Sequence, residues 1–338
     1  MGNRLAAVRP LGATGQKGEL PMKRILAALG AAVTLLAGPA ALAQPAAIIP
    51  PVCDRTCLNG FLDRYMQALA AKDPSRLPLT REARYTENGS VLRLGDGLWG
   101  TIDSLGDYKL TFVDPATQEA GAFFTVRESG REAIVGVRLQ IQSATKINQI
   151  EMLVARRTPG QGPFANAPPP VLTPKPVFYQ DVPAAQRRDR AGMVAITDSY
   201  FEGLERATET LTPFDPNCQR IENGMITAGN PDAPAAMQKM SCGAQFATHF
   251  SPFITHVRER RYPIMDVEKG LGFAIVFFDH AGVIKDVKMT DGSTLHVPPP
   301  FDAPYSFEIF ELFKIVDGRI VRVEAVLDPV PYGMKSGW

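Results

Sequence analysis

The chain has 338 residues, 45% of them hydrophobic and 21% charged, and its formal net charge at pH 7 is +1. This length is sufficient for two domains of ordinary size. A near-neutral charge excludes the strong attraction to phosphate groups on which nucleic-acid binding depends, so we expect no nucleic-acid partner.

The N-terminal region has the pattern of a secretory signal peptide. Met22-Lys23-Arg24 precedes the uncharged run ILAALGAAVTLLAGPA and the small-residue stretch ALAQ. This pattern predicts cleavage after Ala43, with translation starting at Met1 or Met22. A membrane anchor is the alternative, but the run is short and rich in Ala and Gly. Loss of residues 1–43 removes five positive charges and one negative charge, which changes the net charge to −3. We expect a periplasmic or secreted protein with no membrane span after cleavage.

Residues 53–159 are predicted to begin with an amphipathic helix, because apolar residues from Leu58 to Leu69 recur at helical spacing. A proline-punctuated segment follows, and then come strand-like runs at 108–114, 121–128, 132–141 and 147–154. Residues 160–187 are dense in proline and predict an extended linker.

Residues 188–338 repeat this order. A helical pattern over 193–204 precedes strand-like runs, which lie at 254–266, 272–280, 283–289, 306–316 and 319–327. Helices followed by an antiparallel sheet predict the α+β class in each half.

The two halves also align with each other. DRYMQALAAKDPSRLPLTREARYTENG (63–89) matches DSYFEGLERATETLTPFDPNCQRIENG (198–224) without a gap. KINQIEMLV (146–154) and RIVRVEAVL (319–327) close the halves in a similar way. We therefore expect a duplicated domain, in which Glu87 corresponds to Glu222.

This order resembles the cone-shaped α+β superfamily of nuclear transport factor 2, which includes ketosteroid isomerase, scytalone dehydratase and the SnoaL-like polyketide cyclases. The resemblance depends on the helix, short helix and YTENG strand that open a half and on the FKIVDGRI hairpin that closes one. CQRIENG together with the C-terminal VPYGMKSGW resembles a family of secreted bacterial and fungal proteins.

The resemblance implies two tandem cones, each with helices packed on a curved antiparallel sheet around an apolar pocket. It implies a cofactor-free isomerase, dehydratase or hydratase that acts by acid–base catalysis on a bulky, partly apolar small molecule. The chain also lacks nucleotide-binding, nucleophile-elbow and zinc-protease motifs. A non-catalytic module that binds a ligand or a partner protein is the alternative function.

Four cysteines remain after cleavage: Cys53, Cys57, Cys218 and Cys242. An even number in an exported chain predicts disulfides, and local pairing joins Cys53 to Cys57 and Cys218 to Cys242. Zinc binding by the first pair is the alternative, but no histidine lies nearby, so we expect no metal.

The repeated Glu-Asn-Gly is the first candidate for a site. Asn-Gly favours a tight turn, which explains Asn88 and Asn223 without any ligand. A turn does not explain the repeated acid, so Glu87 and Glu222, with the two asparagines, are candidates for substrate binding.

Glu311 is the most unusual charge, because it alternates with Ile309, Phe313 and Ile315 on an apolar strand face. It is expected either to pair with Arg258, Arg260 or Lys285, or to be a catalytic base of raised pKa. In the catalytic interpretation it would act with His256 and Tyr200.

The remaining candidates for substrate binding are Arg258, His280 and Trp99. Each histidine could equally be structural, and the arginines at 258, 260 and 261 could lie on a solvated strand edge. The proline-rich stretch at 295–306 is either a lid or a plain connection. We expect the site to lie in the second half.

Overall fold

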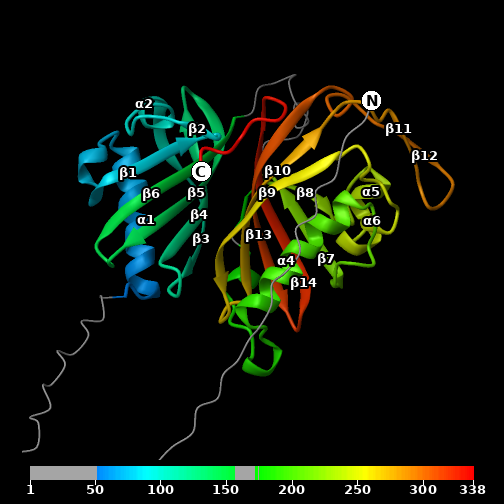
Figure 1. Cartoon of the computed structure of the whole chain (residues 1–338), viewed down its shortest axis with the longest axis horizontal. Coiled ribbons are helices and arrows are strands. Elements are labelled where there is room, and N and C mark those ends of the chain that lie inside the picture. Colours follow the sequence, from blue (N-terminus) through cyan, green and yellow to red (C-terminus); the bar gives the residue numbers. More distant parts are fainter. Residues whose placement is uncertain (1–51, 157–171, 174) are drawn as a thin grey trace, which may run out of the picture. The chain divides into compact units, whose positions relative to one another are not determined.

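The structure is a computed structural model that describes residues 52–156, 172–173 and 175–338. The predicted signal peptide and most of the predicted linker lie outside the described residues. Within these ranges the chain forms two six-stranded sheets, each preceded by a helix, which is the α+β arrangement expected for two tandem cones (Figure 1).

The first half begins with helix α1 (Arg55–Ala70), which Asp54 caps by accepting a hydrogen bond from the Cys57 N–H. After the short helix η1 (Pro74–Arg76), the sheet has the order β2-β1-β6-β5-β4-β3. These strands are β1 (Leu79–Glu87), β2 (Ser90–Val91), β3 (Ile102–Asp114), β4 (Glu119–Glu128), β5 (Arg131–Gln142) and β6 (Lys146–Arg156). A one-turn helix, α2 (Leu98–Thr101), precedes β3.

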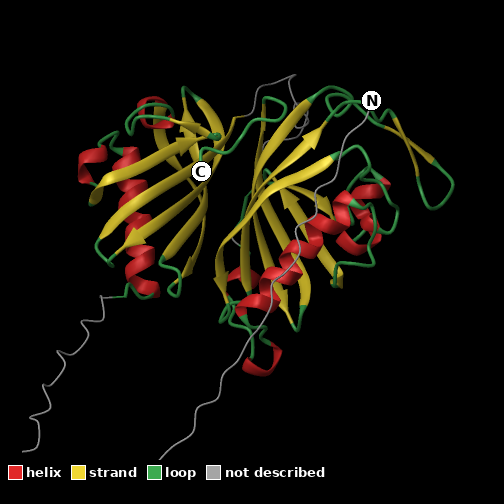
Figure 2. Ribbon diagram, in the orientation of Figure 1, coloured by secondary structure: helices red, strands yellow, loops and turns green. Residues whose placement is uncertain are grey.

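The second half repeats this plan from helix α4 (Arg190–Glu205), which Asp189 caps through the Gly192 N–H. Its sheet has the order β8-β7-β14-β13-β10-β9, which matches the first sheet strand for strand. The strands are β7 (Phe214–Glu222), β8 (Met225–Ala228), β9 (His256–Asp266), β10 (Leu271–His280), β13 (Tyr305–Val316) and β14 (Arg319–Val330). Figure 2 shows α1 and α4 each lying along one face of its own sheet.

Extra segments distinguish the second half from the first. They comprise the short helices α5 (Ala236–Lys239) and α6 (Cys242–Phe246) and a hairpin of β11 (Asp286–Lys288) and β12 (Thr294–His296). The hairpin lies between β10 and β13, where the first half has only the turn between β4 and β5. The run predicted as a strand at 283–289 thus forms one arm of this separate ribbon.

Each sheet is mainly antiparallel, as expected, and each also contains one parallel pair that the sequence did not predict. β1 pairs with β6 in parallel, and β7 pairs with β14 in parallel, while the other neighbours are antiparallel. The parallel strands are distant in sequence, so no hairpin turn dictates their direction, and turn signals alone could not reveal it.

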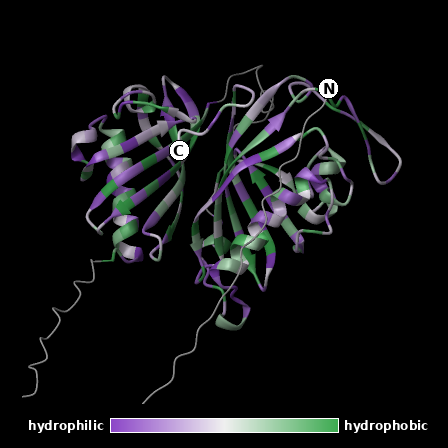
Figure 3. Cartoon of the chain, viewed as in Figure 1, coloured by the Kyte–Doolittle hydropathy of each residue, from purple (hydrophilic) through white to green (hydrophobic). Residues whose placement is uncertain are grey.

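The described residues belong to one compact unit, with three apolar clusters. One cluster joins α1 to the first sheet, and a second joins α4 to the second sheet. The third joins the remaining faces of the two sheets, where Phe112 and Phe123 lie 4.8 and 6.1 Å from Phe273 between ring centroids. Strands buried on both faces are apolar along most of their length, as Figure 3 shows for the second sheet.

The described C-terminal part of the predicted linker packs against the sheets and is not a free extended segment. Helix α3 (Pro176–Tyr179) places Phe178 in the cluster between the sheets, and the Val182 N–H donates to the Glu268 carbonyl. The 3₁₀ helix η2 (Ala184–Gln186) then leads to α4. No described helix is long and apolar enough to cross a membrane.

Both predicted disulfides are present. Cys53 is bonded to Cys57 and Cys218 to Cys242, with Cα–Cα distances of 5.3 Å in each pair. The first bond links the residue before the cap of α1 to its first turn, and the second links β7 to α6. Cys53 and Cys57 are therefore paired as a disulfide, and not as free thiolates that could bind zinc.

Candidate functional site

A cavity of about 260 Å³ lies in the second half. Most of its wall is apolar, and the polar side chains in it are few. Its lining residues are Tyr200, Leu204, Arg220, Glu222, Met225, Thr227, Phe250, Phe253, Ile254, Phe278, His280, Phe301, Phe307, Ile309 and Leu327. A concave apolar site with a few convergent polar groups is the usual form of a small-molecule site.

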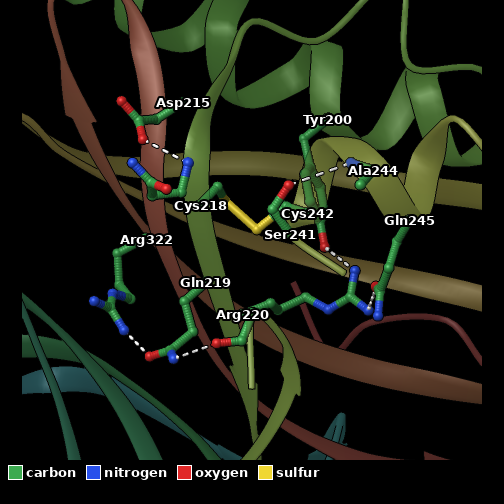
Figure 4. Close-up of a disulfide and its surroundings, with 12 residues drawn as sticks. Tyr200, Asp215, Cys218, Gln219, Arg220, Ser241, Cys242, Ala244, Gln245 and Arg322 are labelled. Atoms are coloured by element: carbon green, nitrogen blue, oxygen red, sulfur yellow. Dashed lines mark hydrogen bonds between the residues drawn. A yellow bond between two sulfur atoms is a disulfide. The ribbon is translucent and has the colours of Figure 1, made fainter. Parts of the chain in front are cut away.

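The polar groups converge on Arg220, which lies on β7. Its guanidinium donates to the Tyr200 hydroxyl at 3.4 Å and to the Gln245 Oε1 at 2.7 Å. Its Nε lies 3.4 Å from the Glu222 Oε2 and 3.1 Å from the Thr227 Oγ1. Figure 4 shows Tyr200, Arg220 and Gln245 directed toward one another. The guanidinium is thus held at one wall of the cavity by four partners, which lie on α4, α6, β7 and β8.

Gln245 is held in turn by the backbone of β8 and of α5. Its amide nitrogen donates to the carbonyls of Thr227 and Met237, each at 2.6 Å. It lies on α6, which begins at Cys242 and is therefore bonded covalently to β7 through Cys218 (Figure 4). The disulfide thus ties the helix that carries Gln245 to the strand that carries Arg220.

Arg220 and Gln245 were missed by the sequence analysis. The signal for Arg220 was present, because it lies two residues before Glu222 and so on the same strand face. An Arg and a Glu on the buried face of one strand indicate an ion pair. Gln245 left no such signal, since its position depends on the fold of an irregular segment.

Glu311 lies on β13, behind the wall of the cavity. Cross-strand pairing places it beside Ala325, which in turn pairs with Glu222. Its side chain is buried, and burial raises the pKa of Glu311 to about 8, reinforced by Glu222 and opposed by Arg220 and the Tyr200 hydroxyl. Among the described residues its Oε2 has no hydrogen-bond partner. At neutral pH the side chain therefore carries its proton.

The corresponding row of the first half holds apolar side chains next to its glutamate. Glu87 pairs with Met152, which pairs with Val137. Met152 and Val137 thus occupy the places of Ala325 and Glu311. The Tyr65 hydroxyl, which corresponds to that of Tyr200, contacts the Met152 sulfur at 3.4 Å. The small Ala325 leaves the Tyr200 hydroxyl free of such a contact.

Glu87 has a structural environment, unlike Glu222. Its Oε2 accepts hydrogen bonds from the Tyr85 hydroxyl and the Leu98 N–H, both at 2.8 Å. Its Oε1 accepts from Arg156 at 2.6 Å. Trp99 is buried against Tyr65, with ring centroids 5.5 Å apart, so it fills the interior of the first half. Neither residue lines the cavity.

Asn88 and Asn223 bond to the backbone. Both have positive φ values, 47° and 45°, as the turn interpretation requires. The Asn88 side chain donates to the Val154 carbonyl and accepts from the Val154 N–H, at 3.1 and 2.8 Å. Asn223 makes the same pair of bonds to Leu327, at 2.8 and 3.0 Å. The repeated asparagine thus ties the turn to the parallel neighbour strand.

His280 lies in the aromatic part of the cavity wall. It stacks on Tyr305 with ring centroids 4.7 Å apart and contacts Phe253, Phe301 and Phe307 at 6.0, 5.3 and 5.5 Å. Burial lowers the pKa of His280 to about 4, so its imidazole is neutral at pH 7. Phe301 belongs to the proline-rich stretch at 295–306, so this stretch covers part of the cavity.

His256 and Arg258 lie outside the cavity, which corrects the expectation that they face Glu311. Exposed His256 contacts Glu205 on α4, and Arg258 pairs with Asp279 at 2.9 Å. Glu259 has a φ of 52° and interrupts the alternation of β9, so strand parity fails there. The other proposed partners of Glu311 are also engaged elsewhere, Arg260 by α4 and Lys285 by the Asp302 carbonyl.

The described residues contain no group of three or more His, Cys, Asp or Glu side chains arranged to hold a metal ion.

Comparison with known proteins places the family match in the second half. A family model described as a domain of unknown function (DUF8021) matches residues 186–327, a range that contains Arg220, Glu222 and Glu311. No curated protein matches the chain.

Several solved structures are similar over part of the chain. A steroid delta-isomerase from Pseudomonas aeruginosa is 14% identical, with a TM-score of 0.25, and the match covers 31% of this chain and 85% of that one. A protein of unknown function with a cystatin-like fold from Methylobium petroleophilum is 15% identical, with a TM-score of 0.27, over 37% and 98%. A de novo designed protein with a curved β-sheet is 14% identical, with a TM-score of 0.26, over 30% and 87%. Likenesses this low carry no argument about function.

Proposed function

We propose that the second half binds a small, largely apolar molecule and transforms it by acid–base catalysis, as an isomerase, dehydratase or hydratase that needs no cofactor. The observation that carries this proposal is the joining of Tyr200, Arg220 and Glu222 at one wall of an otherwise apolar cavity. An ionisable pair in such a cavity supports catalysis over a module that only binds.

The roles follow from position. Glu222 borders the cavity and has one charged partner, Arg220, so its carboxylate is placed to accept a proton from a ligand. The Tyr200 hydroxyl is held by Arg220 and can donate a hydrogen bond to an oxygen that gains negative charge. Glu311 does not line the cavity, so it is a positioning residue that acts through Tyr200.

The cavity volume modifies the expected substrate. Sites for drug-sized ligands typically enclose about 300–1,000 Å³. A volume of about 260 Å³ favours a compact molecule over the bulky one that the resemblance implies.

We also propose that the halves, with boundaries near 53–159 and 188–338, arose by duplication and then diverged. The identical strand order and the equivalent positions of Glu87 and Glu222 support this origin. The first half, in which Met152 fills the matching row, would then be a scaffold. Two disulfides support export to an oxidising compartment.

The test is proton exchange at carbon. The disulfide-bonded protein is incubated in D₂O with a panel of cyclic ketones and hydroxyketones, and NMR follows exchange next to the carbonyl. Glu222→Gln should slow catalysed exchange by about 100-fold or more, the usual contribution of a general base. Glu87→Gln is the matched control and should leave exchange unchanged. Equal rates in Glu222→Gln and the unaltered protein would contradict the proposal, and binding without exchange would favour the non-catalytic module.

A further inference from the structure

The cavity has a polar end and an aromatic end. The pairing register of the strands shows how far apart the two ends lie. The row of Glu222 and Glu311 is followed along β13 by the row of Ile309 and Leu327, and then by that of Phe307 and Phe278. At about 3.3 Å per residue, the polar row and the Phe307 row are roughly 13 Å apart. A ligand that spans the cavity therefore meets polar groups at one end and aromatic groups at the other.

The aromatic end of the cavity is lined by the rings of phenylalanine side chains and of His280. Phe253 and Phe301 have centroids 5.3 Å apart, and both lie within about 6 Å of His280. Phe307 meets the imidazole edge to face, at an interplanar angle of 88°. Aromatic rings attract one another in such offset and perpendicular arrangements beyond the effect of buried area alone. This end therefore favours a flat aromatic ring over a saturated ring of similar size.

The polar end carries no net charge at neutral pH. The Arg220 guanidinium is balanced by Glu222, and its N–H groups already donate to Tyr200, Thr227 and Gln245. Glu311 behind them is protonated, and His280 at the other end is neutral. A ligand carboxylate would place a second negative charge beside Glu222, and among the described residues that line the cavity no further cation is available to balance it. Burying an unpaired charge is costly.

We propose that the ligand is a neutral, flat aromatic molecule with a hydrogen-bonding oxygen at one end, which lies at Tyr200 and Arg220 while the ring lies against Phe253, His280 and Phe301. This inference rests on the proposed function, since it names the substrate class of the same cavity. It adds that the site selects by charge as well as by shape, and that the Arg220–Glu222 pair is the group that rejects anions.

The test uses three probes that share a fused framework of two six-membered rings with one carbonyl-containing substituent. Calorimetry at pH 6.5 compares 2-acetylnaphthalene, which is neutral and aromatic, with 2-naphthoate, which is anionic, and with 2-acetyldecalin, which is saturated. The first should bind at least about tenfold more tightly than each of the others, which corresponds to about 1.4 kcal/mol. Equal or tighter binding of 2-naphthoate would overturn the inference that the ligand is neutral. Equal binding of 2-acetyldecalin would overturn the inference that it is aromatic.

Two variants test separately the preference for a neutral ligand and the preference for an aromatic ligand. Glu222→Gln leaves Arg220 without its counter-charge, so it should strengthen 2-naphthoate binding and reduce or reverse the preference for the ketone. Phe301→Leu should weaken 2-acetylnaphthalene binding by roughly three- to tenfold and leave 2-acetyldecalin nearly unchanged. Tyr332→Leu, which alters an exposed aromatic residue outside the cavity, is the control. An unchanged preference in Glu222→Gln would overturn the role given to the ion pair.

The outcomes also distinguish a failure of this ligand class from a failure of the proposed catalytic function. If no probe binds but the ketone panel still undergoes exchange that depends on Glu222, the substrate class is wrong and the proposed function stands. If no probe binds and no exchange occurs, both fail. If 2-acetylnaphthalene binds with the expected preference and no ketone exchanges, the ligand class stands and catalysis fails.

Discussion

Two glutamates at equivalent positions serve different purposes because their neighbours differ. Glu87 accepts three hydrogen bonds, from Tyr85, Leu98 and Arg156, which engage both of its oxygens. Position 220 holds Arg where position 85 holds Tyr, and within the described part of the chain this arginine is the one charged partner of Glu222. The change from Tyr to Arg two residues away is therefore one of the differences that accompany the position of Glu222 at the cavity wall.

At the residue scale, Glu311→Gln should change the pH dependence of ligand binding. Below pH 8 the Glu311 carboxyl is protonated, and above it the carboxylate competes with the ligand for the Tyr200 hydroxyl. Affinity for 2-acetylnaphthalene should therefore fall in the unaltered protein as pH rises through about 8. Gln cannot ionise, so calorimetry from pH 6.5 to 9.5 should give a flat profile for the variant.

Glu308→Gln is a control on the same strand. Burial raises the pKa of Glu308 well above its ordinary value, but its side chain lies on the opposite face of β13, away from Tyr200. This variant should keep the alkaline loss of affinity. The same loss of affinity in Glu311→Gln as in the unaltered protein would show that Glu311 does not control Tyr200.

At the scale of elements, β14 and β6 are equivalent strands with different roles. β6 contributes Met152 to the row beneath the helix, and β14 contributes Ala325. A methionine side chain reaches the tyrosine hydroxyl in the first half, and an alanine side chain is too short to do so in the second. The smaller side chain of Ala325 therefore leaves room beside the tyrosine hydroxyl for a polar site in the second half, whereas Met152 fills this space in the first half.

Ala325→Met should convert the second half toward the first. Its thioether would occupy the space beside the Tyr200 hydroxyl, and ligand binding should fall by about tenfold or more, while overpacking costs about 1–3 kcal/mol of unfolding free energy. Binding is measured by calorimetry and stability by urea unfolding. The matched change, Met152→Ala, should destabilise the protein by about 2–5 kcal/mol and leave binding intact. Unchanged binding in Ala325→Met would contradict this assignment.

The disulfide between β7 and α6 should support both stability and binding. In the chain-entropy model, a loop of the 24-residue separation between Cys218 and Cys242 stabilises by about 3 kcal/mol. Cys218→Ser with Cys242→Ser should therefore lower the unfolding free energy by about that amount. Ligand affinity should also fall, because α6 positions Gln245 against Arg220.

The short disulfide provides the comparison. Its partners are four residues apart, so replacing Cys53 and Cys57 with serine should cost about 2 kcal/mol in the same model and leave affinity unchanged. Equal losses of affinity in the two double variants would argue against a specific role for the bond to α6.

At the scale of the whole molecule, the contact between the two sheets buries acids as well as apolar residues. Glu324 on β14 accepts a hydrogen bond from the Tyr108 hydroxyl on β3. Asp328 accepts one from Asn88 at 2.9 Å. Burial raises the pKa values of Glu324 and Asp328 to about 7. The contact is therefore sensitive to pH in the physiological range.

Glu324→Gln should stabilise the protein at pH 8 and have little effect near pH 4.5. The folded-state pKa of about 7 exceeds the ordinary value of 4.5, so the contribution of Glu324 to stability is full below 4.5 and is lost as pH rises through 7. Gln does not titrate and can still accept from Tyr108. The gain at pH 8 is at most on the order of 3 kcal/mol, and urea unfolding at both pH values measures it. Exposed Glu132 gives the control, Glu132→Gln, and equal effects of the two variants would contradict the role of burial.

The sequence by itself determined the α+β class, the similar order of elements in the two halves, both disulfides and the turn at each Asn-Gly. These features are local or repetitive. Helical and strand periodicity, an even cysteine count and the φ > 0 preference of Asn-Gly all act over a few residues, so they can be seen without the fold. The burial of Glu311 was also visible, because an acid that alternates with Ile309 and Phe313 must lie on an apolar face.

Only the tertiary structure decided which residues meet at the site. Tyr200, Arg220 and Gln245 lie on α4, β7 and α6, and contacts between elements that are distant in sequence depend on strand order and on the path of the inserted segment. Arg258 and Arg260 contact different elements, Asp279 on β10 and acids on α4, because Glu259, a residue of positive φ, lies between them at a bulge of β9, and strand parity cannot anticipate a bulge. The parallel pairing of β7 with β14, which brings Glu222 beside Ala325 and Glu311, likewise joins residues about 100 positions apart, where no local signal reaches.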